Sequence, residues 1–110
     1  MLNQMILVGR LTRDIVVEKS EDKNAPKENK KYAVISLAIP RSFKNSEGVY
    51  DTDFVDCYAF DSIAANTSEY CKQGDIVGVK GRVERIDSTS EIRLISEKVT
   101  FLSSKKSEED

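Results

Sequence analysis

The sequence predicts an all-β fold, a single small barrel with one short helix. Three observations lead to this prediction. Strand-like apolar segments recur at short intervals and are separated by turns or clusters of charge. One short segment between the third and fourth of them has helical spacing. The chain of 110 residues can close one hydrophobic core but is too short for two of ordinary size.

The first strand is expected at residues 4–11, QMILVGRL, which is apolar enough to be buried on both sides. Residues 14–17 extend it after a bend. Residues 18–31 contain one proline and almost no apolar side chain, so they predict a solvated, mobile loop.

The second strand is expected at residues 32–39, YAVISLAI, in which apolar and outward-facing positions alternate. Pro40 is expected to end it. The polar residues 41–49 then lead into a third strand that runs to Phe60, an arrangement typical of a hairpin with a long tip.

A helix is expected at residues 63–72, with Asp61 and Ser62 as its N-cap and Gly74 just beyond its end. The positions that share its apolar face are Ile63, Thr67, Tyr70 and Cys71.

Two further strands are expected at residues 75–85 and 92–102, joined by residues 86–91. One domain therefore covers residues 1–102, and the acidic residues 103–110 predict a short disordered tail. Five strands with a helix between the third and fourth indicate an OB-fold, a five-stranded Greek-key barrel. Strand number alone would also permit an SH3-like barrel.

Composition excludes several classes of function. The chain has no histidine, and Cys57 and Cys71 lack metal-binding spacing, so they are expected to be buried, reduced thiols. No catalytic, metal or cofactor motif is recognisable. The apolar run near the N-terminus is too short for a membrane span and lacks the features of a signal peptide, which favours the cytoplasm. The formal net charge of -2 is too near zero to decide for or against nucleic acid.

Residues 53–60, DFVDCYAF, contain three of the eight aromatic residues of the chain. Strand alternation separates their side chains into two sets. The inward set is Val55, Cys57 and Ala59, and the outward set is Phe54, Asp56, Tyr58 and Phe60. Small side chains suit a barrel interior, and an unpaired buried aspartate would be costly, so the aromatic set is expected to face outward.

Basic residues are expected to border these rings. Alternation places Lys80 and Arg82 outside on the strand at residues 75–85, with Val77, Val79 and Val83 inside. Arg41 and Phe43 repeat the combination on the hairpin. Arg10, Lys72, Arg85 and Arg93 are candidates for the rim, and the sequence leaves open the side of the sheet on which Arg93 lies. Rings flanked by cations suit single-stranded nucleic acid, because bases stack on rings and cations contact phosphates. The alternative is that the rings only cover the barrel against a helix or another subunit.

Three motifs, LVGRLTRD (7–14), TDFVDCYAF (52–60) and GDIVGVKGRVE (74–84), resemble in order and spacing those of the bacterial-type single-stranded DNA-binding proteins, including phage and plasmid versions. The resemblance covers about residues 3–102. It implies an OB-fold, a homotetramer or else a dimer, and non-catalytic binding of single-stranded DNA with little sequence preference in the cytoplasm, at the nucleoid or replication fork. Replication and repair proteins are the implied partners.

The resemblance places the base-stacking positions of the family on Phe43, Phe54 and Phe60. Tyr58 stands where the family usually has an aliphatic residue, and the carboxylate of Asp56 stands where a basic or polar residue is common. These departures predict weaker binding than is usual in the family. The alternative function is that of an OB-fold replication accessory of the primosome type, which acts mainly through protein contacts.

Overall fold

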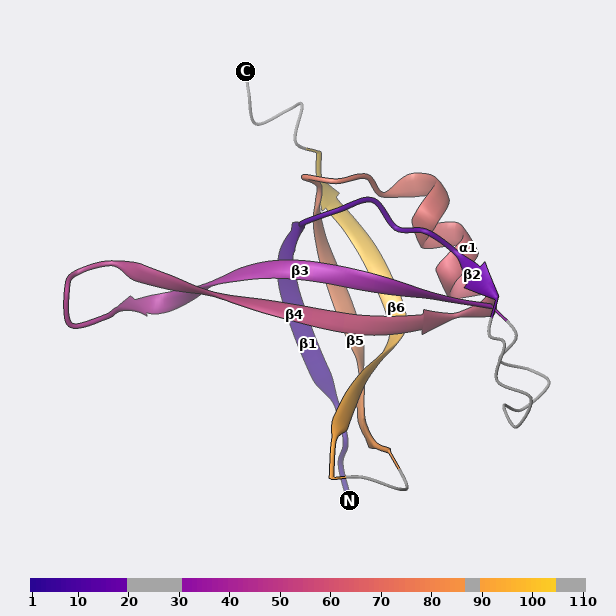
Figure 1. Ribbon diagram of the computed structural model, residues 1–110, viewed down its shortest axis with the longest axis horizontal. Coiled ribbons are helices and arrows are strands. Elements are labelled where there is room, and N and C mark those ends of the chain that lie inside the picture. Colours follow the sequence, from indigo (N-terminus) through magenta and orange to yellow (C-terminus); the bar gives the residue numbers. More distant parts are fainter. Residues whose placement is uncertain (20–30, 87–89, 105–110) are drawn as a thin grey trace.

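The computed structural model of the protein describes residues 1–19, 31–86 and 90–104. Within these ranges the chain forms six strands and one helix (Figure 1). The elements are β1 (Met5–Leu11), β2 (Glu18–Lys19), β3 (Lys31–Lys44), β4 (Tyr50–Phe60), α1 (Asp61–Tyr70), β5 (Ile76–Arg85) and β6 (Ile92–Ser103).

The five long strands close into a barrel. The strand order is β1-β5-β6-β4-β3-β2, and β1 also pairs with β3 at Arg10 and Leu11, which joins the two ends of the sheet. β4 and β6 run parallel, and the other pairs are antiparallel. The predicted five-stranded barrel with a helix between its third and fourth long strands is confirmed, and its topology is that of the OB-fold.

The core is built from the inward positions of these strands. Its largest fully buried side chains are Leu11, Ile35, Leu37, Cys57, Val77 and Val79. Cys57 and Ala59 are buried as the alternation predicts, and Val55 is half-buried. Val83 was expected inside, but 36% of it is exposed. It lies towards the loop end of the β5–β6 hairpin, opposite Leu94.

Two glycines allow strands to approach more closely than a side chain would permit. A Cβ atom on Gly81 would lie 1.8 Å from the carbonyl oxygen of Ile95, and one on Gly9 would lie 2.9 Å from that of Ala38. The β5–β6 register shifts between Lys80 and Gly81, at the place of this close contact. Gly81 therefore permits the bulge that sets the rest of the hairpin.

The β3–β4 hairpin projects from the barrel as a long arm, on the left of Figure 1. Pro40 does not end β3, contrary to the sequence prediction, since the strand continues to Lys44. Pro40 pairs with Thr52 on β4, and the register of the two strands shifts between Pro40 and Lys44, the kind of irregularity at which a strand accommodates proline. Asn45 shapes the tip because its Oδ1 accepts hydrogen bonds from the N–H groups of Glu47 and Val49 at 2.8 and 3.0 Å.

The helix differs from the prediction in its bounds and its cap. It begins at Asp61, directly after β4, and its N-cap residue is Phe60, with no side-chain cap hydrogen bond. The φ of Asp61 is 48°, a left-handed value that aspartate tolerates better than most residues. Tyr70, which was expected on the apolar face, is 70% exposed, and the buried positions of α1 are Ala64 and Thr67.

Part of the predicted loop at residues 18–31 is ordered. Glu18 and Lys19 form β2 and pair with Tyr32 and Lys31, a strand that the polar sequence did not predict. Residues 20–30, the loop residues 87–89 and residues 105–110 lie outside the described residues. The last of these ranges holds most of the predicted tail at residues 103–110, whereas Ser103 is the last residue of β6.

Both cysteines are free and buried, as the sequence predicts. Burial raises the pKa of the Cys57 thiol to about 11, and the nearby Asp56 carboxylate adds to the shift. The Cys71 pKa is also raised, chiefly by burial. The Cys57 thiol therefore stays protonated at neutral pH, which makes it a structural residue of the core rather than a nucleophile.

Candidate nucleic-acid interface

Four aromatic side chains on β3 and β4, together called the aromatic surface, lie on the outer face of the barrel: Tyr32, Phe54, Tyr58 and Phe60. The strand register places Phe60 opposite Tyr32 and Phe54 opposite Ala38. Phe54 is 76% exposed, and the other three rings are half-buried. The predicted outward direction of the rings agrees with this burial.

Tyr58 lies at the centre of the aromatic surface. Its ring centroid is 6.5 Å from that of Tyr32, with an angle of 30° between the planes. The guanidinium of Arg93, on β6, lies over the Tyr58 ring at 4.8 Å from the centroid. Tyr32 is not among the predicted site residues, whereas Arg93 is a predicted rim cation whose side of the sheet the sequence leaves open. Alternation places Tyr32 outside, but only the pairing of β3 with β4 and of β4 with β6 shows that these groups meet.

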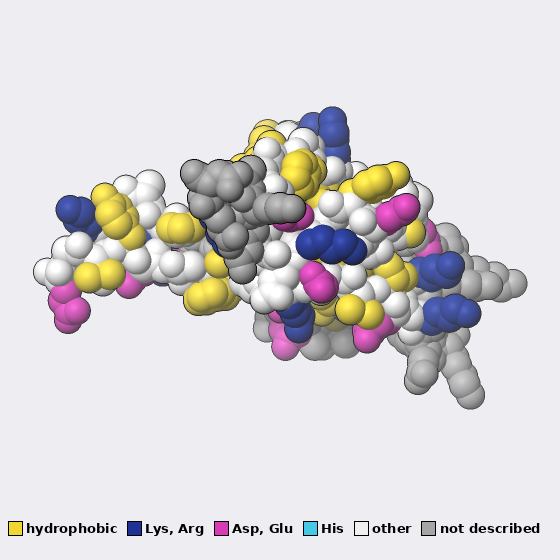
Figure 2. Space-filling view, turned by 90° about the horizontal axis from the view of Figure 1, so that it is seen from above, with side chains coloured by type: hydrophobic (Ala, Val, Ile, Leu, Met, Phe, Trp, Pro, Cys, Tyr) yellow, Lys and Arg dark blue, Asp and Glu magenta, His cyan; other side chains and the backbone are white. Residues whose placement is uncertain are grey.

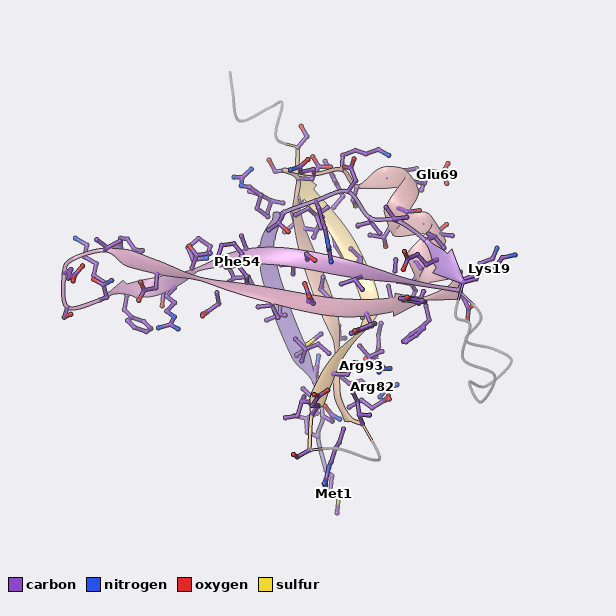
Figure 3. All side chains as sticks on the ribbon, viewed as in Figure 1. Met1, Lys19, Phe54, Glu69, Arg82 and Arg93 are labelled. Atoms are coloured by element: carbon purple, nitrogen blue, oxygen red, sulfur yellow. The ribbon has the colours of Figure 1, made fainter. Side chains whose placement is uncertain are left out.

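The same outer face continues across β6 to β5. Ile95 is paired with Tyr58 on one side and with Arg82 on the other. Residues paired across strands share a face, so Arg82, Ile95 and Tyr58 form one row, and Arg93 lies two residues from Ile95 on the same side. Figure 3 shows Arg82 and Arg93 close together below the β3–β4 hairpin. Arg82 is bound by Glu84 at 2.8 Å and by Glu97 at 3.8 Å.

The arm carries Phe43, which is 62% exposed, and Tyr50, which is 53% exposed. A cation lies near each ring: the Arg41 guanidinium is 6.0 Å from the Phe43 centroid, and the Lys44 ammonium is 5.8 Å from that of Tyr50. The arm therefore repeats the pairing of ring and cation that occurs on the barrel.

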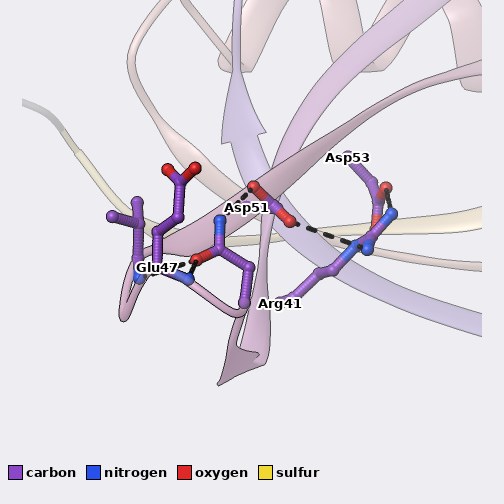
Figure 4. Close-up of polar contacts among 6 residues, drawn as sticks. Arg41, Glu47, Asp51 and Asp53 are labelled. Atoms are coloured by element: carbon purple, nitrogen blue, oxygen red, sulfur yellow. Dashed lines mark hydrogen bonds and ion pairs between the residues drawn. The ribbon is translucent and has the colours of Figure 1, made fainter.

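Arg41 is held by carboxylates on the neighbouring strand (Figure 4). Its Nε and Nη2 donate to Asp53 at 3.2 and 3.0 Å, and its Nη1 lies 3.9 Å from Asp51. The hydrogen bond from Arg41 lowers the pKa of the Asp53 carboxyl, and the same bond raises the pKa of Arg41. Arg41 thus lies beside a ring, as predicted, with its charge already balanced.

Asp56 takes part in a hydrogen-bond chain on the outer face. Its Oδ1 accepts a hydrogen bond from the Ser36 hydroxyl at 2.7 Å, and the Ser36 oxygen accepts one from Arg13 Nε at 3.1 Å. The guanidinium of Arg13 offsets part of the negative charge at this position. The prediction that Asp56 weakens binding stays a prediction.

The other predicted cations lie away from the rings or serve the fold. Arg10 donates to the backbone oxygen of Gly74 at 2.7 Å and so ties β1 to the turn before β5. Lys80 is exposed opposite Ile6, on the β1–β5 side of the barrel. Lys72 lies just after α1, and Arg85 is exposed at the end of β5. The structure does not gather these four around the aromatic surface.

Charge is mixed over the molecule. Figure 2 shows basic, acidic and apolar side chains interspersed in the view from above, without a block of one sign. In the described ranges no group of three or more cysteine, aspartate or glutamate side chains could hold a metal ion. Nor does this part of the chain contain a helix long and apolar enough to cross a membrane.

A closed five-stranded barrel with exposed rings and guanidinium groups on one outer face defines an OB-fold binding protein. Residues 2–101 match the Single-strand binding protein family, and the chain belongs to this family.

Relatives with similar sequences carry consistent names. The chain is 40% identical over 84 residues to single-stranded DNA-binding protein B of Bacillus subtilis. These 84 residues are 76% of this chain and 69% of that protein. It is 38% identical over 84 residues to single-stranded DNA-binding protein 1 of Streptococcus agalactiae, again over 76% of this chain but only 48% of the relative. The chain thus spans about half the length of the streptococcal relative.

Solved structures agree with the fold. The crystal structure of a small single-stranded DNA-binding protein from Streptomyces coelicolor matches with a TM-score of 0.66 and 19% identity, over 93% of this chain and 95% of that one. A mitochondrial single-stranded DNA-binding protein from S. cerevisiae matches with a TM-score of 0.67 over the same shares of the two chains. At this identity the likeness concerns the fold.

Proposed function

We propose that this protein binds single-stranded DNA with little sequence preference, by stacking bases on its exposed rings and by contacting phosphates with neighbouring cations. The observation that carries the proposal is the outward position of Phe54, Tyr58 and Phe60 on β4, with Arg93 in contact with Tyr58. A ring that is 76% exposed, as Phe54 is, gains little from folding but offers a free face to a base.

The geometry favours stacking over base-specific hydrogen bonds. Every base has a π-face, so a surface of rings accepts any sequence. The proposed stacking residues are Phe43 on the arm and Phe54 and Phe60 on the barrel. The main proposed phosphate contact is Arg93. Arg41 and Arg82, whose carboxylate partners balance their charge, and the outlying cations Arg10, Lys72, Lys80 and Arg85 contribute less.

The proposed role is binding alone, without a catalytic step. Protection of exposed single strands during replication, recombination and repair is the proposed role, and membership of the family supports it. Replication and repair proteins are the proposed partners, and the cytoplasm, at the nucleoid or replication fork, is the proposed location.

A homotetramer is the proposed assembly, with a dimer as the alternative. Ile6 and Val8 on β1 and Leu102 on β6 are between 50% and 69% exposed, and Val8 and Leu102 flank Gly78 on the outside of the barrel. Exposed apolar side chains of this kind support contact with a second copy. Light scattering measures the assembly, and a monomer at micromolar concentration would contradict it.

The experiment that tests the function is a fluorescence-anisotropy titration of labelled oligo-dT with the protein in a series of salt concentrations. Phosphate contacts release counterions, so the logarithm of the binding constant should fall linearly with the logarithm of the salt concentration, by about 0.7 per phosphate contacted. Absence of salt-sensitive binding would contradict the proposal and would favour a role through protein contacts.

The Arg41–Asp53 pair predicts a gain of affinity on substitution. In Asp53→Asn the amide keeps its shape but loses its charge, so Arg41 becomes available to phosphate and one repulsive carboxylate is removed. We expect oligo-dT to bind several-fold more tightly and with a steeper salt dependence. Glu47→Gln is the control, because the Glu47 carboxylate is exposed on the same arm. Glu47 bonds to Asn45 through its backbone N–H and not through its side chain. An equal gain from both substitutions would show that general charge, not Arg41, is responsible.

A further inference from the structure

The contact between Arg93 and Tyr58 distinguishes this arginine from others near the rings. Arg41 is bound to Asp53, and Arg82 is bound to Glu84. Glu84 lies opposite Arg93 in the strand register, but its carboxylate binds Arg82. In the described part of the chain no ion pair joins a carboxylate to Arg93, and its Nε is buried without a hydrogen-bond acceptor. Buried cationic groups usually have an anionic or polar partner, because an unpaired N–H costs free energy.

Tyr58 explains why Arg93 is stable in this position without a carboxylate. The guanidinium lies 4.8 Å from the ring centroid, within the range of a cation–π contact. Nε is buried, but such stacking leaves the terminal Nη groups of the guanidinium available for hydrogen bonds with an anion. It also covers one face of the Tyr58 ring, so that face is not available to a base.

We infer that Arg93 is a phosphate-contacting residue for single-stranded DNA and that Tyr58 is a positioning residue, which holds the Arg93 guanidinium in place instead of stacking on a base. The inference rests on the proposed function, because it names a contact for the same ligand. It divides the aromatic surface by role: Phe54 offers an open ring face, whereas Tyr58 acts through the arginine that covers it.

The position of Arg93 fits a strand of DNA that crosses the barrel. Arg93 lies between Tyr58 on β4 and the β5 strand that carries Arg82, on the face shared by the row Arg82, Ile95 and Tyr58. A backbone that passes from the rings of β4 towards β5 would reach the guanidinium of Arg93 before that of Arg82, which Glu84 and Glu97 neutralise.

The test is an oligo-dT titration of Arg93→Ala and Arg93→Gln, each at several salt concentrations. We expect both to bind about tenfold more weakly, as is typical for loss of a hydrogen bond to a charged group. The slope of the salt dependence should fall by about 0.7 for each lost phosphate contact. Lys98→Ala removes the same charge from β6 on the side facing Lys80, and should change binding less.

Tyr58 requires a different readout, because it acts through Arg93. Tyr58→Leu should weaken binding several-fold in the wild-type background but by less than about twofold in the Arg93→Gln background, since coupled residues are not additive. Tyr58→Phe keeps the aromatic ring that contacts Arg93, so this variant should bind oligo-dT as tightly as the wild type. Thermal melting checks that each variant is folded.

Two results would overturn the inference. If both Arg93 variants bind with the wild-type affinity and salt slope while Phe54→Ala weakens binding, the function stands but Arg93 is not a contact. If Tyr58→Leu weakens binding equally with and without Arg93, the Tyr58 ring acts directly on the DNA. Failure of the wild-type protein itself to bind oligo-dT would instead reject the proposed function.

Discussion

Replacing Gly81 with alanine is expected to destabilise the barrel more than any other single-methyl addition on β5. The new Cβ would lie 1.8 Å from the backbone oxygen of Ile95, which no side-chain adjustment relieves. The β5–β6 backbone must shift to accommodate it, and overpacking of this kind costs about 3 kcal/mol. For a domain of this size the midpoint of thermal unfolding should fall by roughly 10 to 20 °C, as measured by circular dichroism.

Gly78→Ala is the matched control on the same strand. A Cβ there would meet Leu102 and Val8 at 3.7 and 3.9 Å, which are ordinary contacts. Because alanine also restricts the unfolded chain, this variant should melt within a few degrees of the wild type or slightly above it. If the two variants melt together, Gly81 does not set the close contact between β5 and β6.

Replacing Phe54 with alanine is expected to weaken binding of single-stranded DNA by about 1 to 3 kcal/mol, the usual value of one base–ring stack. The ring is 76% exposed, so its removal should change the free energy of unfolding little. Anisotropy with oligo-dT measures the first effect and thermal melting the second. A large loss of stability with unchanged binding would show that the ring belongs to the core.

Tyr70→Ala is the control for Phe54. Tyr70 is 70% exposed, nearly as much as Phe54, but it lies at the end of α1 and not on the aromatic surface. Its removal takes away an equally exposed ring, and we expect binding within error of the wild type. Equal losses of DNA affinity in the two variants would mean that any exposed ring contributes to binding, wherever it lies on the surface.

Alternation along β4 was sufficient to predict the direction of the rings. Cys57 and Ala59 are buried and Phe54 is open, because a small barrel leaves room inside only for small side chains. Prediction from residue type alone was wrong where pairing with a neighbouring strand determines the secondary structure. Pro40 lies inside β3 beside a register shift in the pairing with β4, and Glu18 and Lys19 form β2 because β3 offers an edge.

The contacts of the cations could not be predicted from spacing. Arg93 and Tyr58 are 35 positions apart, and they meet only because the parallel β4–β6 pairing sets Tyr58 opposite Ile95. Arg41 was predicted as a phosphate contact from its position beside Phe43, but its bonds to Asp53 depend on the register shift in the arm. Sequence shows the residue types, whereas register determines which charges remain available.

The motif LVGRLTRD contributes more to the fold than to the interface. Gly9 lets β1 approach β3, Arg10 bonds to the backbone of Gly74, and the Ser36 hydroxyl accepts from Arg13. Asp14 accepts a hydrogen bond from the N–H of Gln73 at 2.7 Å. These contacts join β1 and the residues after it to β3 and to the turn before β5. A resemblance in this motif is therefore evidence for the fold more than for the DNA-binding surface.

The most direct test of the central claim is a competition measurement on the wild-type protein bound to labelled oligo-dT. Unlabelled single strands of mixed sequence should displace the label as well as oligo-dT does, because stacking on Phe54 and Phe60 does not depend on the base. A duplex of the same sequence should compete far less, because its bases are not free to stack. Equal competition by duplex and single strand would show that phosphate attraction alone accounts for binding, and would contradict the role assigned to the aromatic surface.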